Sequence, residues 1–85
     1  VAVLGGSGGN YVRDIPGDVD VLITGDVRYH DALDARVRDL ALIDIGHAGG
    51  ERCIVPAVAA FLRKKLPIDV VAYKDEEPFV FWNGK

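Results

Sequence analysis

A histidine and a glutamate stand four residues apart in the sequence, at His47 and Glu51. On one helical turn, side chains with this spacing face the same space. An imidazole nitrogen and a carboxylate oxygen together suit a borderline divalent ion such as zinc, manganese or iron. A catalytic metal takes three or more protein ligands. Taken alone, the pair is therefore more often a surface hydrogen bond than a metal site.

A second pair with the same spacing is formed by Asp26 and His30. A carboxylate and an imidazole that share one space can act as acid and base partners or clamp a substrate. The pair follows an apolar run and precedes a helical pattern, and for an isolated pair a structural role is the more common one. In that case Asp26 would accept hydrogen bonds from loop amides and His30 would pack at the helix entrance.

Glycine dominates the segment from Gly5 to Gly9, in which Ser7 is the only side chain. Successive backbone N–H groups in such a loop can cradle an anion. The segment lacks the Lys-Ser/Thr ending of a P-loop, and Tyr11 stands where a dinucleotide fingerprint needs its third glycine. Its letters match the Gly-x-Ser-x-Gly nucleophile elbow, but Pro16-Gly17 shortens the helix that must follow. Two interpretations stay open, a turn for close backbone approach and an anion loop. The anion loop would use Gly6, Ser7, Gly8 and Gly9.

Short apolar runs predict the strands that must position these residues. They cover residues 1–4, 19–24, 41–45 and 68–73, and their continuous apolar character is typical of strands covered on both faces. The first three end at the glycine segment, at Asp26 and just before His47. Carboxyl ends of parallel strands meet at one edge of a sheet. We therefore expect the three groups of candidate residues to crowd together.

Two helical patterns separate the strands. The first covers residues 31–40, with Asp31 as N-cap and an apolar stripe toward the core. That stripe consists of Leu33, Val37 and Leu40. The second covers residues 53–66, with Pro56 in its first turn and Pro67 stopping it. Its apolar stripe consists of Ile54, Ala57, Val58, Phe61 and Leu62.

The remaining segments are short. Residues 10–18 leave room for at most one or two helical turns between the first two strands. Residues 79–82 form an apolar tail, predicted as an edge strand or a docking patch. Together the elements predict an α/β fold, a three-layer-like β-α-β-α-β unit with a mostly parallel sheet. We expect residues 1–85 to be a single domain piece of a larger fold, because the chain opens at Val1 inside an apolar run.

Composition excludes several classes of protein. The 85 residues carry a net charge of −3 and a pI of about 5.1, which argues against a nucleic-acid-binding surface. The apolar runs are far shorter than the ~20 residues that span a bilayer. Cys53 is the single cysteine; on the apolar side of a helix it is more often a core residue than a nucleophile. One cysteine cannot form an internal disulfide, so we expect a reducing, cytoplasmic location.

The order of these segments resembles one protein family. It is the dinuclear-metal-centre family of toroidal hexamers, the GTP cyclohydrolase I type 2 homologues or Nif-three-like proteins. The resemblance rests on the glycine segment after a strand, on Thr24-Gly25-Asp26 with Tyr29-His30, and on Gly46-His47 with Glu51. It runs over nearly the whole chain and corresponds to the C-terminal part of the family fold.

The resemblance implies a divalent metal centre with two ions per intact protein, of zinc, iron, manganese or magnesium. His47 and Glu51 would be metal ligands, and the remaining ligands would come from an N-terminal half. Asp26 and His30 would line the same cavity as catalytic groups. The resemblance also implies a homo-oligomer, as a hexamer, and a metal-dependent hydrolase acting on a nucleotide or another phosphorylated molecule. The alternative is a non-enzymatic metal-binding scaffold or regulatory protein.

Overall fold

The computed structural model describes residues 1–84, which divide into two compact units. The first unit spans Val1–Cys53 and the second begins at Ile54. Each unit is described by itself.

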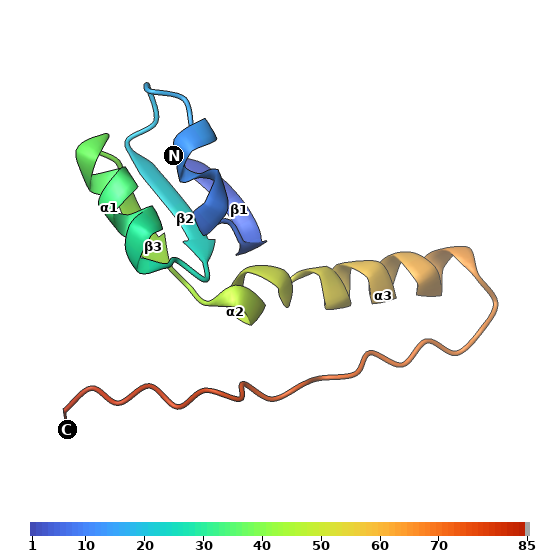
Figure 1. The fold of residues 1–85 in the computed structure, drawn as a ribbon. Coiled ribbons are helices and arrows are strands. Elements are labelled where there is room, and N and C mark those ends of the chain that lie inside the picture. Colours follow the sequence, from blue (N-terminus) through green and yellow to red (C-terminus); the bar gives the residue numbers. More distant parts are fainter. Residues whose placement is uncertain (85) are drawn as a thin grey trace. The chain divides into compact units, whose positions relative to one another are not determined.

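A parallel sheet of three strands forms the first unit, in the order β1-β2-β3. The strands are β1 (Ala2–Ser7), β2 (Val21–Gly25) and β3 (Ala41–Asp44) (Figure 1). The predicted α/β fold with a mostly parallel sheet is confirmed. The first strand is longer than predicted, because it continues through the glycine segment to Ser7. Its pairing with β2 is irregular between Val3 and Ser7.

The strands are joined by short helical connections. A 3-10 helix, η1 (Gly9–Asp14), fills the segment between β1 and β2, as the limited length there predicted. Helix α1 (Tyr29–Val37) joins β2 to β3, and α2 (His47–Glu51) follows β3. The guanidinium of Arg38 donates hydrogen bonds to the backbone carbonyls of Val12 and Ile15. These bonds add donors at the end of η1, where the Val12 carbonyl also accepts the backbone N–H of Ile15 at 3.4 Å.

The core of this unit lies between the sheet, η1 and α1. Leu22 at the centre of β2 has no exposed surface. The buried cluster consists of Val12, Ile15, Leu22, Ala35 and Leu40.

Helix α1 corrects two expectations. Its buried residues are Asp31 and Ala35, whereas Leu33 is exposed and Val37 has 88% of its surface exposed. The predicted apolar stripe is therefore wrong except for Leu40, which is buried just after the helix. A methyl side chain such as that of Ala35 lets the helix approach the core closely.

Helix α1 also begins earlier than the sequence predicts. The helix is capped at Arg28, whose backbone is extended, and Asp31 is its third residue. The Asp31 carboxylate accepts hydrogen bonds from the backbone N–H of Arg28 at 3.1 Å and from its Nε at 3.2 Å. Asp31 thus serves the helix terminus from inside the first turn, in the manner of a capping box.

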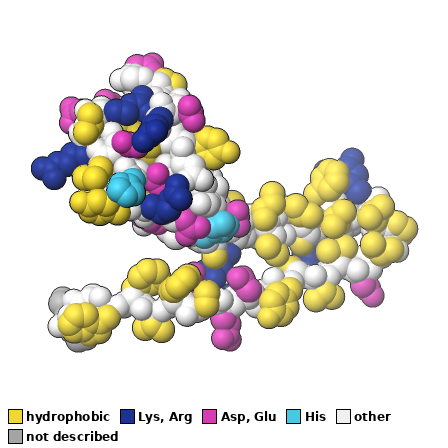
Figure 2. Space-filling model, viewed as in Figure 1, with side chains coloured by type: hydrophobic (Ala, Val, Ile, Leu, Met, Phe, Trp, Pro, Cys, Tyr) yellow, Lys and Arg dark blue, Asp and Glu magenta, His cyan; other side chains and the backbone are white. Residues whose placement is uncertain are grey.

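The second unit begins with helix α3 (Ile54–Lys65). Pro56 lies in its first turn and the helix ends before Pro67, both as predicted. Of the apolar residues of α3, only Ala59 is buried, so its predicted stripe faces outward here. Figure 2 shows hydrophobic side chains gathered along this unit.

The predicted strand over residues 68–73 is not formed, and residues 79–82 are not a strand either. The Arg63 guanidinium donates hydrogen bonds to the backbone carbonyl of Val70 at 2.8 and 3.2 Å. A strand instead needs a neighbouring strand, whose backbone groups form the hydrogen bonds of the sheet. Within residues 1–84, no helix is long and apolar enough to cross a membrane.

Candidate metal centre

His47 and Glu51 lie on one face of the short helix α2. Gly46 precedes the helix with a positive φ of 77° and turns the chain away from β3. The spacing places His47 Nε2 at 3.2 Å from Glu51 Oε2. The structure therefore brings together the two residues that the sequence paired.

Asp26 approaches the same histidine from the end of β2. Its Oδ2 lies 2.6 Å from His47 Nδ1, and its backbone has a positive φ of 53°. Aspartate tolerates this left-handed conformation better than most residues. The His47 ring is thus held between two carboxylates, one on each nitrogen. All three side chains are about half-exposed, so a ligand can reach them.

The two carboxylates change the proton affinity of the ring. The hydrogen bond with Asp26 and the negative charge of Glu51 raise the pKa of His47, against the opposing effect of burial. In the metal-free protein, the imidazolium form is stabilised by both neighbours.

The glycine segment packs against this cluster. Gly6 has a positive φ of 69°, and a Cβ there would overlap Glu51 Oε1 and lie 3.3 Å from His47 Nε2. A Cβ on Gly5 would lie 3.2 Å from the carbonyl oxygen of Gly50. Strand β1 can therefore approach α2 only because these positions lack side chains.

Two other glycines of this segment also have packing roles. A Cβ on Gly8 would overlap the Thr24 side chain, and one on Gly9 would lie 2.7 Å from Asp31 Oδ2. Of the two sequence-based interpretations, close backbone approach describes what the glycines do here. An anion loop formed by Gly6, Ser7, Gly8 and Gly9 stays a prediction.

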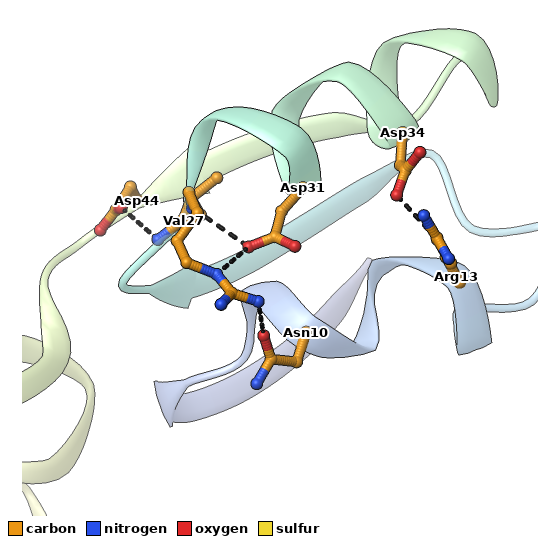
Figure 3. Close-up of polar contacts among 7 residues, drawn as sticks. Asn10, Arg13, Val27, Asp31, Asp34 and Asp44 are labelled. Carbon is orange, nitrogen blue, oxygen red and sulfur yellow. Dashed lines mark hydrogen bonds and ion pairs between the residues drawn. The ribbon is translucent and has the colours of Figure 1, made fainter.

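His30 has different neighbours from Asp26. It is the second residue of α1, and its ring meets the Tyr29 ring edge-on with centroids 5.5 Å apart. It lines a cavity together with the arginines Arg13 and Arg28 and the carboxylates that pair with them. Figure 3 shows these paired groups on η1 and α1. The contacts of His30 and Asp26 therefore differ, and the catalytic role predicted for the two stays a prediction.

The donor atoms fit part of a metal site. Two ligands that each lie about 2.0–2.2 Å from one ion are roughly 3 Å apart, close to the 3.2 Å between His47 Nε2 and Glu51 Oε2. Metal-binding histidines usually donate their other ring proton to a carboxylate, as Asp26 allows. Among residues 1–84, no group of three or more His, Cys, Asp and Glu side chains could hold an ion by itself. The roles of His47 and Glu51 as metal ligands therefore stay a prediction.

The sequence reasoning missed two features of the cluster. It paired Asp26 with His30, whereas the structure pairs Asp26 with His47, which is 21 residues away. The expectation that three strand ends crowd one sheet edge is confirmed. That expectation could have predicted the contact, because Asp26 and His47 follow neighbouring parallel strands. The sequence reasoning also assigned no role to Asp44, the last residue of β3. An aspartate two residues before a glycine is a pattern typical of Asx turns.

Comparisons with known proteins extend over most of the chain. A family model described as Duf34/NIF3 (NGG1p interacting factor 3) matches residues 1–78. The GTP cyclohydrolase 1 type 2 homolog of Campylobacter jejuni is 35% identical over 82 residues, which cover 96% of this chain and 33% of that protein. The Staphylococcus aureus homolog is 46% identical over 48 residues, covering 55% of this chain and 13% of that protein.

Two crystal structures share the fold. A Staphylococcus aureus protein superposes with a TM-score of 0.77 at 34% identity, covering 94% of this chain and 28% of that chain. A Bacillus cereus protein related to NIF3 gives a TM-score of 0.72 at 31% identity, covering 94% of this chain and 24% of that chain. The chain therefore spans a third or less of each of these relatives. Because the family model matches 78 consecutive residues that include the whole candidate centre, the chain belongs to the Duf34/NIF3 family.

Proposed function

We propose that this chain supplies half of a dinuclear metal centre in a metal-dependent, hydrolase-like protein. His47 and Glu51 are the ligands, and Asp26 orients the histidine. The observation that carries the proposal is the chain of contacts from Asp26 through both nitrogens of His47 to Glu51. The other ligands come from outside residues 1–84. When bound, the two ions supply Lewis-acid catalysis and lower the pKa of water.

Each of the three residues has a distinct task. Asp26 accepts a hydrogen bond from the Nδ1–H of His47, which fixes the tautomer and leaves Nε2 as the atom that binds the metal. Glu51 offers two oxygens, and a carboxylate can therefore serve one ion or bridge two. Gly6 leaves the space that both side chains occupy. This arrangement suits zinc, manganese or iron, because imidazole and carboxylate together match their ligand preferences.

For the substrate we propose a small phosphorylated molecule or a nucleotide. Support comes from the printed name of the relatives, GTP cyclohydrolase 1 type 2 homolog, and from the cavity beside His30, which Arg13 and Arg28 also line. Within this proposal, His30 transfers a proton to or from the substrate during hydrolysis, because Asp26 is engaged with His47 Nδ1. A His30→Ala variant of the full-length protein then keeps its metal but loses turnover in a screen of nucleotides.

The ligand assignment is tested by elemental analysis of the full-length protein. We expect about two divalent ions per chain in the wild type, and a fall in both His47→Ala and Glu51→Ala, because each change removes a donor atom. Two matched controls carry the same changes away from the cluster, His30→Ala and Glu76→Ala. A metal content near zero in the wild type, or one unchanged in the ligand variants, contradicts the assignment.

A second function has its own observation. In the second unit the aromatic residues Phe79, Phe81 and Trp82 are all exposed, with 84% of the Trp82 surface open. Exposed apolar groups of this size mark interaction surfaces. This favours a metal-binding scaffold or regulatory protein that assembles with itself or a partner. Loss of assembly on changing Trp82, with no turnover of any nucleotide tested, favours the scaffold over the enzyme.

A cytoplasmic location remains our proposal for the protein. It agrees with Cys53, which is a free and exposed thiol. Free thiols persist where the glutathione and thioredoxin systems keep cysteines reduced. Fractionation of cells that make the tagged full-length protein tests this proposal.

A further inference from the structure

The carboxylate of Asp44 accepts hydrogen bonds from two different loops. Its Oδ2 accepts the backbone N–H of Val27 at 3.1 Å, and its Oδ1 accepts the backbone N–H of Gly46 at 2.8 Å. Figure 3 shows Asp44 at the end of its strand with the bond to Val27 drawn. One carboxylate therefore ties the loop after β2 to the loop after β3.

Each of these amides belongs to the neighbour of a residue in the candidate centre. Val27 follows Asp26 directly, and Gly46 precedes His47 directly. Both loops also contain a positive φ, at Asp26 and at Gly46. Left-handed backbone persists where surrounding contacts hold it. The two hydrogen bonds to Asp44 lie immediately beside these two positions.

Besides the contact between the Asp26 and His47 side chains, the two loops meet through their backbones. Ile45 N–H donates to the Thr24 carbonyl at 2.8 Å. A Cβ on Gly25 would lie 2.6 Å from the backbone nitrogen of His47, so the two chain segments touch without side chains between them. Two side-chain hydrogen bonds link the segment after β2 to the segment after β3: the Val27 N–H donates to Asp44, and Asp26 pairs with His47.

We propose that Asp44 is a positioning residue of the metal centre. By fixing both loops with one carboxylate, it holds Asp26 Oδ2 against His47 Nδ1 and so aims His47 Nε2 at the position of the ion. It acts through these two residues and is not itself a ligand. This inference rests on the proposed function only for the presence of the metal ion.

The two oxygen acceptors of the Asp44 carboxylate determine which variants test the proposal. Asp44→Ala removes both acceptors, whereas Asp44→Asn keeps the side-chain volume and one acceptor, because an amide nitrogen cannot accept an N–H. The matched control is Asp34→Asn on α1. Asp34 accepts a hydrogen bond from Arg13 at 2.7 Å and lies outside both loops.

Two measurements on the full-length protein test the proposal. The first is the imidazole Nδ1 proton signal of His47 in the metal-free state, identified by its loss in His47→Ala. Slow exchange of this proton with water reports the hydrogen bond to Asp26. The second is the dissociation constant for Zn²⁺. We expect Asp44→Ala to lose the proton signal and to raise the dissociation constant about 10–100-fold, as changes to residues behind metal ligands do. Asp44→Asn shows the same changes to a smaller degree, and Asp34→Asn shows neither.

The proposal is overturned if both Asp44 variants keep the proton signal and the zinc affinity of the wild type. Where Asp44→Ala does not fold, judged by its far-ultraviolet circular dichroism, Asp44→Asn decides, since it changes no volume. A wild-type protein that binds no Zn²⁺ contradicts the proposed function. The Nδ1 proton signal then still decides whether Asp44 positions His47.

Discussion

The His47 imidazole uses both of its nitrogens, and each faces a carboxylate at 2.6 or 3.2 Å. The same geometry suits two states of the ring. With a proton on each nitrogen, the ring forms two ion pairs; with Nε2 unprotonated, the ring and Glu51 present two donor atoms to a cation. The contact with Asp26 is common to both states. At the scale of single residues, this shared contact supports the proposed role of His47 as a metal ligand.

Gly6 gives the sharpest test at this scale. Gly6→Ala places a methyl group where Glu51 Oε1 lies and forces alanine to adopt a φ of 69°. Left-handed backbone costs a non-glycine residue about 1–3 kcal/mol. We therefore expect a loss of unfolding free energy of that order, together with weaker metal binding. Urea unfolding and zinc titration of the full-length protein measure the two effects.

The control for this prediction is Gly17→Ala. A Cβ on Gly17 would meet no atom within 4 Å, and Gly17 is not among the residues with positive φ. The same chemical change there leaves stability nearly unaltered or raises it slightly. If Gly6→Ala behaves like Gly17→Ala, the packing of β1 against Glu51 is wrong.

At the scale of elements, the sequence predicted the three parallel strands well and the buried face of α1 poorly. Leu22 is buried because one face of the sheet packs against η1 and α1, and an apolar run in a strand is a direct signal of such burial. The cover expected on both faces is not found within residues 1–84, since Val3 and Ile43 are 67% and 49% exposed. The sequence signal for the buried face of α1 was weaker. Leucine and valine at helical spacing favoured a stripe through Leu33 and Val37, yet Ala35 and Asp31 face the core. Ala35 is buried because its small side chain allows close packing, and Asp31 is buried because it accepts the capping hydrogen bonds from Arg28. Neither effect appears in a count of apolar positions.

The start of α1 predicts a pH dependence of stability. Burial acts to raise the pKa of Asp31, but the hydrogen bonds from the Arg28 backbone and guanidinium outweigh it, with the charges of Arg28 and Arg13, and hold that pKa below its ordinary value. A lowered folded-state pKa stabilises the protein at pH values above the unfolded pKa. This contribution is lost as the pH falls through the folded-state pKa.

Asp31→Asn tests the sign. We expect the variant to be less stable than the wild type at about pH 7, where the carboxylate is charged, and the difference to shrink toward about pH 3 as Asp31 becomes protonated. Urea unfolding of the full-length protein across this range measures the difference. Asp18→Asn, an exposed carboxylate between η1 and β2, is the control. A difference between Asp31→Asn and wild type that grows at low pH would reverse the assignment.

At the scale of the whole molecule, the two units differ in how far sequence could predict them. The first unit buries one apolar cluster against its own sheet, and the sequence placed its candidate residues together because strand ends meet at one edge. The second unit leaves most of its apolar residues exposed. The run over residues 68–73 has the composition of a strand, but strand formation also requires a partner, which periodicity cannot supply. Local pattern also cannot identify the further ligands that the proposed centre needs, because residues 1–84 contain no group of three or more His, Cys, Asp and Glu side chains that could hold an ion.

The exposed tail carries the last prediction. A protein that assembles through Phe81 and Trp82 buries two large aromatic side chains, and truncating such an anchor costs about 2–4 kcal/mol of association free energy. That loss corresponds to roughly 30–1,000-fold in the dissociation constant. We therefore expect the double variant Phe81→Ser with Trp82→Ser to shift the full-length protein to smaller species in sedimentation equilibrium.

Val37→Ser is the matched control, since Val37 on α1 is as exposed as the aromatic residues but belongs to the first unit. The double variant should keep the metal content of the wild type, because the tail contributes no ligand to the proposed centre. A molar mass that stays the same in the double variant contradicts the assembly role. A loss of metal together with assembly would show instead that the centre is completed across the contact between copies, which would join the two proposed functions at one interface.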